Sequence, residues 1–420
     1  MQDIPILNRA FATITMSFAK VNALTSCIYF FKLQAFFDMV GGLAASNLWY
    51  NPHIMRKSIL TALAVAIIAG CGKDDGSADF EKGVAAHAAR DLRAAVGFFG
   101  SAAKKNPTNF TARIKLALAN IDLGEMPSAR DAVESALAIE PQSAEARLVD
   151  GQIAFYTRDY SRARKDFNAV AEAERLPPAI RSQALSELAV AEISENNFDM
   201  ARLALWRAVR LDRKNAAAWY HLGHLSRDTY RFENAALEQF EMAGRLIKDP
   251  ERAKAIAHSV IPALRESLRA KMASKPGAST RDPATAAKLV AEGEALQKRD
   301  PKRASAKFSE AYSKDPLSYA AAWNYAKATS ASAKTDSSVD KALAAFQDAI
   351  DVRPNSQELY RTAAEAARRH GRNMQAAKFL NQALAHEFEN KATLKIYVQV
   401  LRRLGRASEA KLYEAYLKEL

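Results

Sequence analysis

The sequence is poor in cysteine and lacks the short motifs of common enzymes. Its 420 residues include two cysteines, Cys27 and Cys71, too few for a disulfide framework. No G-x-x-x-x-G-K-[ST], H-E-x-x-H or G-x-S-x-G occurs, so nothing indicates a P-loop, a zinc protease or a serine hydrolase. The alternation typical of strands is also absent, and apolar residues recur every three or four positions. We therefore expect an all-α protein that is not an enzyme and has no cofactor.

Two histidines come near to metal-ligand spacing. His221 and His224 stand three positions apart on one predicted helix, where both could reach one ion. No third histidine or carboxylate at ligand spacing supports them. We expect packing roles for both and no metal site.

Alanines that recur at a constant interval dominate the chain. Neighbouring members of this set are 34 residues apart in four cases, and Ala236 and Ala304 are 68 residues apart, which is two periods. An aromatic or aliphatic residue typically follows four positions on, a second small residue seven on, and in several units a proline twelve on. The alanines are Ala95, Ala129, Ala163, Ala236, Ala304, Ala342, Ala376 and Ala410.

This pattern resembles the tetratricopeptide repeat (TPR), a helix–turn–helix unit of about 34 residues. The unit containing Trp219, Gly223 and Ala236 is the most similar to the family consensus, and Ala201 marks a further unit. The resemblance implies an all-α superhelical solenoid of about nine such units, because one unit cannot bury its apolar face alone. Small residues twelve positions before the key alanines are expected to face the partner helix: Gly83, Ala117, Gly151 and Ala364.

A basic start and an apolar run precede Cys71. Met55 and two cations lead into the apolar residues 59–68, as in a secretory signal peptide. Ile68, Ala69, Gly70 and Cys71 resemble the lipobox of bacterial lipoproteins. That resemblance implies cleavage before Cys71 and acylation of its thiol, with 55–70 as the signal peptide and 71–77 as a lipidated tether. Gly72, where retained lipoproteins carry aspartate, implies the outer membrane, facing the periplasm.

Residues 1–54 precede a complete signal peptide. This favours an upstream extension that arises from a start codon assigned too early. The alternative is a real membrane segment at roughly Ala23–Ala45, although Lys32 and Asp38 interrupt it and a spanning helix has few charges.

Turn-forming residues divide the repeats. A helical stretch from Glu251, interrupted by Pro262, leads into a loop at Ser274–Pro283. We expect an N-terminal array at 78–250, an irregular helix and linker at 251–284, and a C-terminal array at 285–420. Two packed arrays and one continuous superhelix both fit. A second insertion, Ser330–Val339, is expected to lengthen a loop.

Positive charge is concentrated late in the chain. Residues 1–70 carry +3, 71–250 carry −1 and 251–420 carry +11, which together give the net +13. Such an excess can attract anionic lipid, polysaccharide or an acidic protein face; ordinary solvated surface is the alternative. Nucleic acid is not expected, because no stacking aromatics accompany the cations. The expected surface comprises Arg361, Arg368, Arg369 and Arg372.

The TPR resemblance also implies a groove lined by one face of the first helix in each unit. A purely spacing role for these positions is the alternative. The clamp by which chaperone-binding TPR domains hold a carboxylate is not present. The groove positions are Leu148, Gln152, Phe155, Tyr156, Tyr220, His224 and Arg227.

The expected function is a periplasmic TPR lipoprotein that binds protein partners and scaffolds an envelope assembly of the pilus, secretion or exopolysaccharide type. Its membrane contact would be the lipid on Cys71. A cytoplasmic TPR adaptor and a regulatory subunit of an envelope enzyme are the alternatives.

Overall fold

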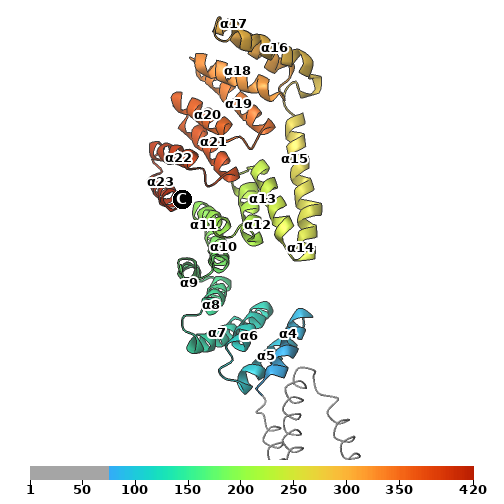
Figure 1. The fold of residues 1–420 in the computed structure, drawn as a ribbon, viewed down its shortest axis with the longest axis vertical. Coiled ribbons are helices and arrows are strands. Elements are labelled where there is room, and N and C mark those ends of the chain that lie inside the picture. The colour runs from blue at the N-terminus through green and yellow to red at the C-terminus, as the bar shows by residue number, and fades with distance from the viewer. Residues whose placement is uncertain (1–74) are drawn as a thin grey trace, which may run out of the picture. The chain divides into compact units, whose positions relative to one another are not determined.

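The computed structural model describes residues 75–420, and residues 78–420 form one compact unit. The expected extension, the signal peptide and the lipobox with Cys71 therefore lie outside the described residues. Helices and short turns make up the described part, as the sequence predicts (Figure 1). Within that part no helix combines the length and apolar character needed to cross a membrane.

Nine helical hairpins and one long helix build the described chain, which confirms the expected number of repeat units. Five hairpins precede the long helix. They are α4 (Ser77–Ala88) with α5 (Leu92–Lys105), α6 (Phe110–Leu123) with α7 (Met126–Ile139), α8 (Ala144–Tyr156) with α9 (Tyr160–Ala171), α10 (Pro178–Ser194) with α11 (Phe198–Leu211), and α12 (Ala216–His224), continued by η2 (Leu225–Thr229), with α13 (Glu233–Leu246).

Four hairpins follow the long helix. They are α16 (Pro283–Leu296) with α17 (Pro301–Lys314), α18 (Tyr319–Ser332) with α19 (Asp336–Val352), α20 (Gln357–Arg369) with α21 (Asn373–His386), and α22 (Lys391–Arg403) with α23 (Ala407–Glu419).

The alanines that recur once in each repeat unit are all core residues, each at most 1% exposed. Glycine permits an even closer approach. A Cβ on Gly151 would lie 2.6 Å from Cε1 of Phe167, and one on Gly293 would lie 2.5 Å from Cε1 of Phe308. Gly83 and Gly223 approach a phenylalanine in the same way. The large residue of each second helix thus fills the space that the small residue of the first leaves open.

The turn inside most hairpins needs one residue in the left-handed region. Glycine takes it at Gly124, with φ 83°, because it has no Cβ to clash. Arginine takes it at Arg90 and Arg158, each with φ 62°. The helix that follows often starts on an aspartate: Asp91, for example, accepts from the Ala94 N–H at 3.1 Å.

The long helix comprises α14 (Pro250–Ala255), η3 (Ile256–Val260) and α15 (Ile261–Ala273). The expected irregularity lies beside Pro262, where the chain stays helical but the regular α-helix is interrupted. A π-helical turn precedes the proline, and the wider turn accommodates a ring that would otherwise clash with a carbonyl of the preceding turn. The helix runs along one side of the molecule, packs on α13 and leads to the second group of hairpins (Figure 1).

The insertion at Ser330–Val339 does not lengthen a loop, contrary to expectation. Only residues 333–335 separate α18 from α19. Thr335 and Ser338 cap α19 reciprocally, and α19 has 17 residues where its counterparts α17 and α21 have 14. The additional residues therefore extend a helix, because a capping box allows it to begin early.

The last hairpins fold back onto the middle of the chain. Helix α23 packs on α11, and α21 packs on α13 (Figure 1). The largest hydrophobic core combines residues of α8–α12 with residues of α18–α23. The later hairpins thus pack on the earlier ones within one compact unit. The choice between two packed arrays with a hinge and one superhelix with an irregular unit stays open. The boundaries at 250 and 285 stay predictions, since residues 78–420 form one unit.

Candidate protein-binding site

An aromatic cluster lies where α8 turns into α9. The ring centroid of Phe155 is 5.6 Å from that of Tyr156 and 5.7 Å from that of Tyr160. Phe155 is partly buried against the core, whereas Tyr156 is 57% exposed. The left-handed Arg158 turns the chain between the two helices. Two predicted groove residues are therefore adjacent, and one of them is open to solvent.

A second cluster forms around Phe240 on α13. The His224 ring centroid is 4.6 Å from that of Tyr220 and 5.1 Å from that of Phe240. The guanidinium of Arg227 lies 5.5 Å from the Phe240 ring centroid, within cation–π range. Tyr220, His224 and Arg227 are each half-buried. The structure thus brings three predicted groove residues together.

The polar atoms of this second cluster engage Asp228. Arg227 Nε lies 2.7 Å from Asp228 Oδ1, and His224 Nδ1 lies 3.1 Å from Asp228 Oδ2. The hydrogen bond from Arg227 holds the pKa of the Asp228 carboxyl below its usual value. An acidic partner would have to displace Asp228 from Arg227.

His221 faces the interior and differs in role from His224. Burial lowers the pKa of His221 to about 4, and the neighbouring His224 adds to the shift. Within residues 75–420 no group of three or more His, Cys, Asp or Glu side chains is placed to hold a metal ion.

Two further groove predictions have other surroundings. Leu148 is 6% exposed and belongs to the main core, so the expectation that it lines an open groove is wrong. The prediction for Leu148 fails because α8 buries apolar side chains against helices on both sides. Gln152 donates from Nε2 to Glu187 Oε1 on α10 at 3.1 Å. Burial raises the pKa of Glu187.

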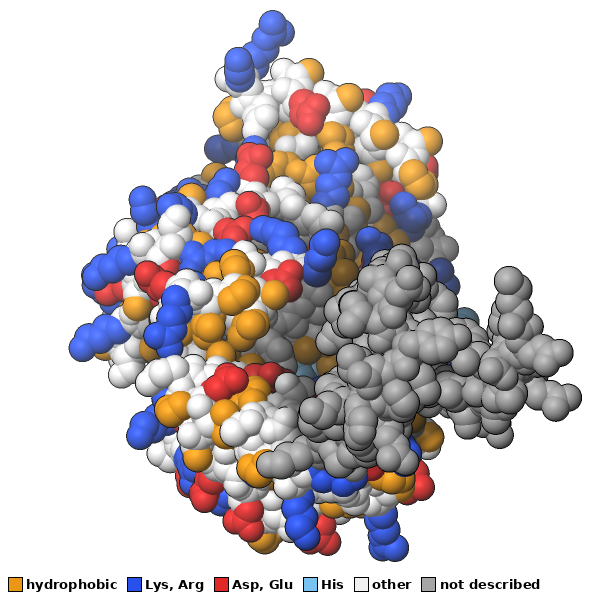
Figure 2. All heavy atoms as spheres, turned by 60° about the horizontal axis from the view of Figure 1, so that its bottom comes forward, with side chains coloured by type: hydrophobic (Ala, Val, Ile, Leu, Met, Phe, Trp, Pro, Cys, Tyr) orange, Lys and Arg blue, Asp and Glu red, His pale blue; other side chains and the backbone are white. Residues whose placement is uncertain are grey.

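The predicted basic surface is partly neutralised within the chain. Arg368 pairs with Glu365 at 3.2 Å, and Arg372 pairs with Asp336 at 2.8 Å. Arg361 is half-buried, and Arg369 is the exposed member of the set. Figure 2 shows Lys and Arg side chains interleaved with Asp and Glu across the visible face. The four arginines therefore do not make an unopposed positive surface.

A buried polar network at the α11–α23 contact was not predicted. Arg202 on α11 is 2% exposed and donates from Nη2 to Asp199 Oδ1 at 2.8 Å. It also donates to Tyr413 of α23 and Asn381 of α21. Tyr413 donates to Asp199 at 2.7 Å. Burial opposes ionisation of Asp199, yet Arg202 and these hydrogen bonds hold its pKa below the usual value.

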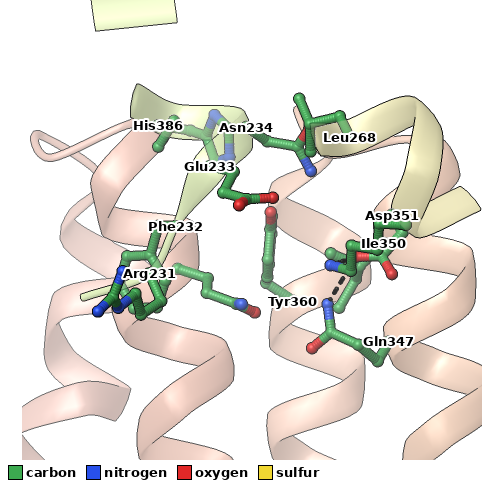
Figure 3. A pocket seen from close by; sticks show the side chains of 13 residues that line it. Arg231, Phe232, Glu233, Asn234, Leu268, Gln347, Ile350, Asp351, Tyr360 and His386 are labelled. Carbon is green, nitrogen blue, oxygen red and sulfur yellow. Dashed lines mark hydrogen bonds and ion pairs between the residues drawn. The ribbon is translucent and has the colours of Figure 1, made fainter. Parts of the chain in front are cut away.

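A small cavity lies near the same junction. About 30 Å³ of space, enough for roughly one water molecule, is enclosed between α13, α15 and α19–α21. Tyr360 points toward the Glu233 carboxylate, and Gln347 donates to Asp351 at 3.0 Å (Figure 3). Burial raises the pKa of Tyr360 well above its usual value. The cavity is too small for a ligand, and it is a gap in the packing between these helices.

Comparisons with known proteins agree with the repeat. Residues 86–153 match the family model of the tetratricopeptide repeat. No curated protein matches the chain. Among solved structures, PilF of Pseudomonas aeruginosa is 15% identical with a TM-score of 0.39, over 57% of this chain and 97% of that one. A tetratricopeptide-repeat protein from Parabacteroides merdae is 12% identical with a TM-score of 0.31, over 78% and 99%.

MamA from Desulfovibrio magneticus is 19% identical with a TM-score of 0.34, over 41% of this chain and 95% of that one. The family assignment itself depends on the constant spacing of the repeats, the buried alanines at each unit and the match at 86–153. On these grounds the described chain is an all-α helical-repeat solenoid that matches the tetratricopeptide repeat at residues 86–153.

Proposed function

We propose that this protein is a membrane-anchored scaffold that binds protein partners in an assembly of the bacterial envelope. TPR proteins are generally scaffolds without catalytic activity, and a helical-repeat fold supports the binding of protein partners. The observation that carries the proposal is Tyr156, a large aromatic side chain that is 57% exposed and lies beside Phe155, whose ring in turn lies beside Tyr160. Aromatic side chains of this kind supply most of the binding energy at protein interfaces.

The anchor in this proposal is lipid on Cys71. Six residues, 72–77, separate it from Ala78, a reach of roughly 20 Å when extended. Such a tether would hold the hairpins near the bilayer, on the periplasmic side of the outer membrane. Palmitate labelling and the mass of the mature amino terminus test this point. Unlabelled, unprocessed chain that behaves like a Cys71→Ser variant would refute the anchor.

Site-specific crosslinking tests the binding surface. With p-benzoylphenylalanine in place of Tyr156, we expect one discrete crosslinked partner in intact cells. Met374 is 65% exposed and lies on α21, so the same probe there serves as the matched control. Equal crosslinking patterns from both positions, or none from Tyr156, would contradict a binding role for this cluster.

Two alternative functions give different results in the same experiments. A cytoplasmic adaptor would remain in the soluble fraction without lipid. A regulatory subunit would crosslink to an envelope enzyme and change its activity when Tyr156 is replaced.

A further inference from the structure

The turn between α16 and α17 carries a dense group of cations. Lys298, Arg299, Lys302 and Arg303, called the basic tip from here on, lie within six residues and are all exposed. In the part of the chain that the structure describes, none of the four makes an ion pair. This contrasts with Arg368 and Arg372, whose charges are paired.

Nearby acidic groups are already engaged. Asp300, within the tip, accepts from the Arg303 N–H at 3.0 Å and caps α17. Glu292 pairs with Lys307 at 2.8 Å, and Glu294 accepts from Asn324 at 3.1 Å. Counting Asp300, the tip therefore keeps a net charge of about +3 on a short turn, where charges this close together act jointly.

Two of the cations are also placed against the local electrostatics. Lys302 and Arg303 occupy the first turn of α17, which contains no acidic residue. The helix macrodipole is positive at that end, so cations there oppose it. Asp300 at the N-cap offsets only part of this, since one carboxylate stands against two cations. A sequence that breaks such a local rule often does so at a functional site.

The surroundings of the tip define its partner. Gln297 precedes the cations and Pro301 lies between them, and no exposed aromatic or large apolar side chain lies on this turn. Protein interfaces need desolvated anchors of that kind. Phosphates of a fluid lipid surface need none, since they can move to meet each cation. Both Arg and Lys bind phosphate through charge-assisted hydrogen bonds.

We propose that the basic tip binds the anionic phospholipid surface of a membrane, as a contact separate from the lipid on Cys71. The proposal rests on the proposed function in one respect, because the anchor would keep the chain close to a bilayer. The tip itself does not require acylation to bind headgroups. Failure of the anchor and failure of the tip can therefore be distinguished.

Full-length protein in neutral phosphatidylcholine nanodiscs provides the test. The probes are vesicles that contain phosphatidylglycerol and vesicles of phosphatidylcholine alone, and co-sedimentation is measured at low and high salt. We expect binding to the anionic vesicles only, and weaker binding at high salt. Each cation should contribute about fivefold, so neutralising all four to Gln should reduce binding on the order of a hundredfold or more.

A matched control carries the same loss of charge elsewhere. Arg361, Arg368, Arg369 and Arg372 are changed to Gln, and this variant should bind almost as the wild type does. Exchanging Lys for Arg and Arg for Lys within the tip should also preserve binding, which shows that the turn tolerates substitution. If the two quadruple Gln variants lose vesicle binding equally, the net charge of the protein and not the basic tip determines binding, and the proposal is overturned.

Two further outcomes decide the partner's chemistry. Soluble polyglutamate should compete poorly with anionic vesicles at equal charge concentration. If it competes as well as they do, the tip recognises an acidic chain and the lipid assignment is wrong. Cys71→Ser protein that takes up no palmitate should still bind the anionic vesicles. Loss of binding in this variant would overturn the proposal that the tip is a contact separate from the lipid.

Discussion

Arg202 and Tyr413 lie 211 positions apart in the chain, yet the guanidinium of one donates to the hydroxyl of the other. Arg202 also lies over the ring of Tyr230, 4.4 Å from its centroid, and over Trp206. The Nη atoms of this arginine have polar partners and its plane lies over three aromatic rings, whereas its buried Nε has no hydrogen-bond partner. The contact joins the last hairpin to the fourth and excludes water from both.

Removing Arg202 should be severely destabilising. Arg202→Met leaves Asp199 partly buried without its cation, and breaking one partner of a buried pair costs about 3–5 kcal/mol. Urea unfolding followed by circular dichroism measures this. Arg403→Met on α22, where the side chain is exposed, is the control and should change stability by under about 0.5 kcal/mol. Similar losses in both would show that the network does not hold the two groups of hairpins together.

Replacing glycine by alanine should lower the stability of the fold at one site and raise it at another. In Gly151→Ala the new methyl would lie 2.6 Å from Phe167, so overpacking should cost about 1–3 kcal/mol. In Gly97→Ala nothing lies within 4 Å, and the helix should gain about 0.5–1 kcal/mol. Thermal melts compare the two variants with the wild type. Melting temperatures that shift in the same direction in both variants would contradict this packing.

A bulky side chain at a repeat alanine should separate two helices. Ala129 is fully buried, and Ala129→Phe should cost about 1–3 kcal/mol. Ser128 is the exposed neighbour, where Ser128→Phe should cost under about 0.5 kcal/mol. Differential scanning calorimetry compares them, and equal melting shifts would mean that the helical register is wrong.

Stability should fall in mild acid because of His221. Its pKa is about 4 in the folded chain and 6.5 as the reference value. Between pH 4 and pH 6.5 the unfolded chain binds a proton at His221 that the folded chain does not. The free energy of unfolding therefore has its full value above pH 6.5 and decreases as the pH falls toward 4. The loss is up to about 3 kcal/mol. His221→Leu should flatten the dependence in urea titrations, and an NMR titration of His221 near 6.5 in the wild type would contradict the argument.

The local part of the fold was predictable because it is periodic. Ala129 and its counterparts recur at a constant interval, and their burial follows from the close packing of two helices. Arg202 was not predictable in this way. It follows the buried Ala201 on α11, where the repeat alone predicts a solvent-facing side chain, and only the return of α23 covers it. Long-range contacts of this kind leave no periodic signal.

The candidate site was predicted in part for the same reason. Tyr220, His224 and Arg227 share one helix face, so their proximity follows from helical spacing. The pairing of Arg372 with Asp336 does not, because it joins two hairpins. Charge counted along the sequence therefore does not reveal that two of the four arginines expected to form the positive surface, Arg368 and Arg372, are paired with carboxylates.

The return of α23 onto α11 also constrains how this chain can change over evolution. An open solenoid can gain or lose a unit at little cost, since each repeat touches only its neighbours. Here a duplicated or deleted hairpin between α12 and α22 would carry Tyr413 away from Arg202 and Asp199 and break the contact between the last hairpin and α11. The number of repeats in this segment is therefore set by closure, and variation in length should be confined to the hairpins before α10.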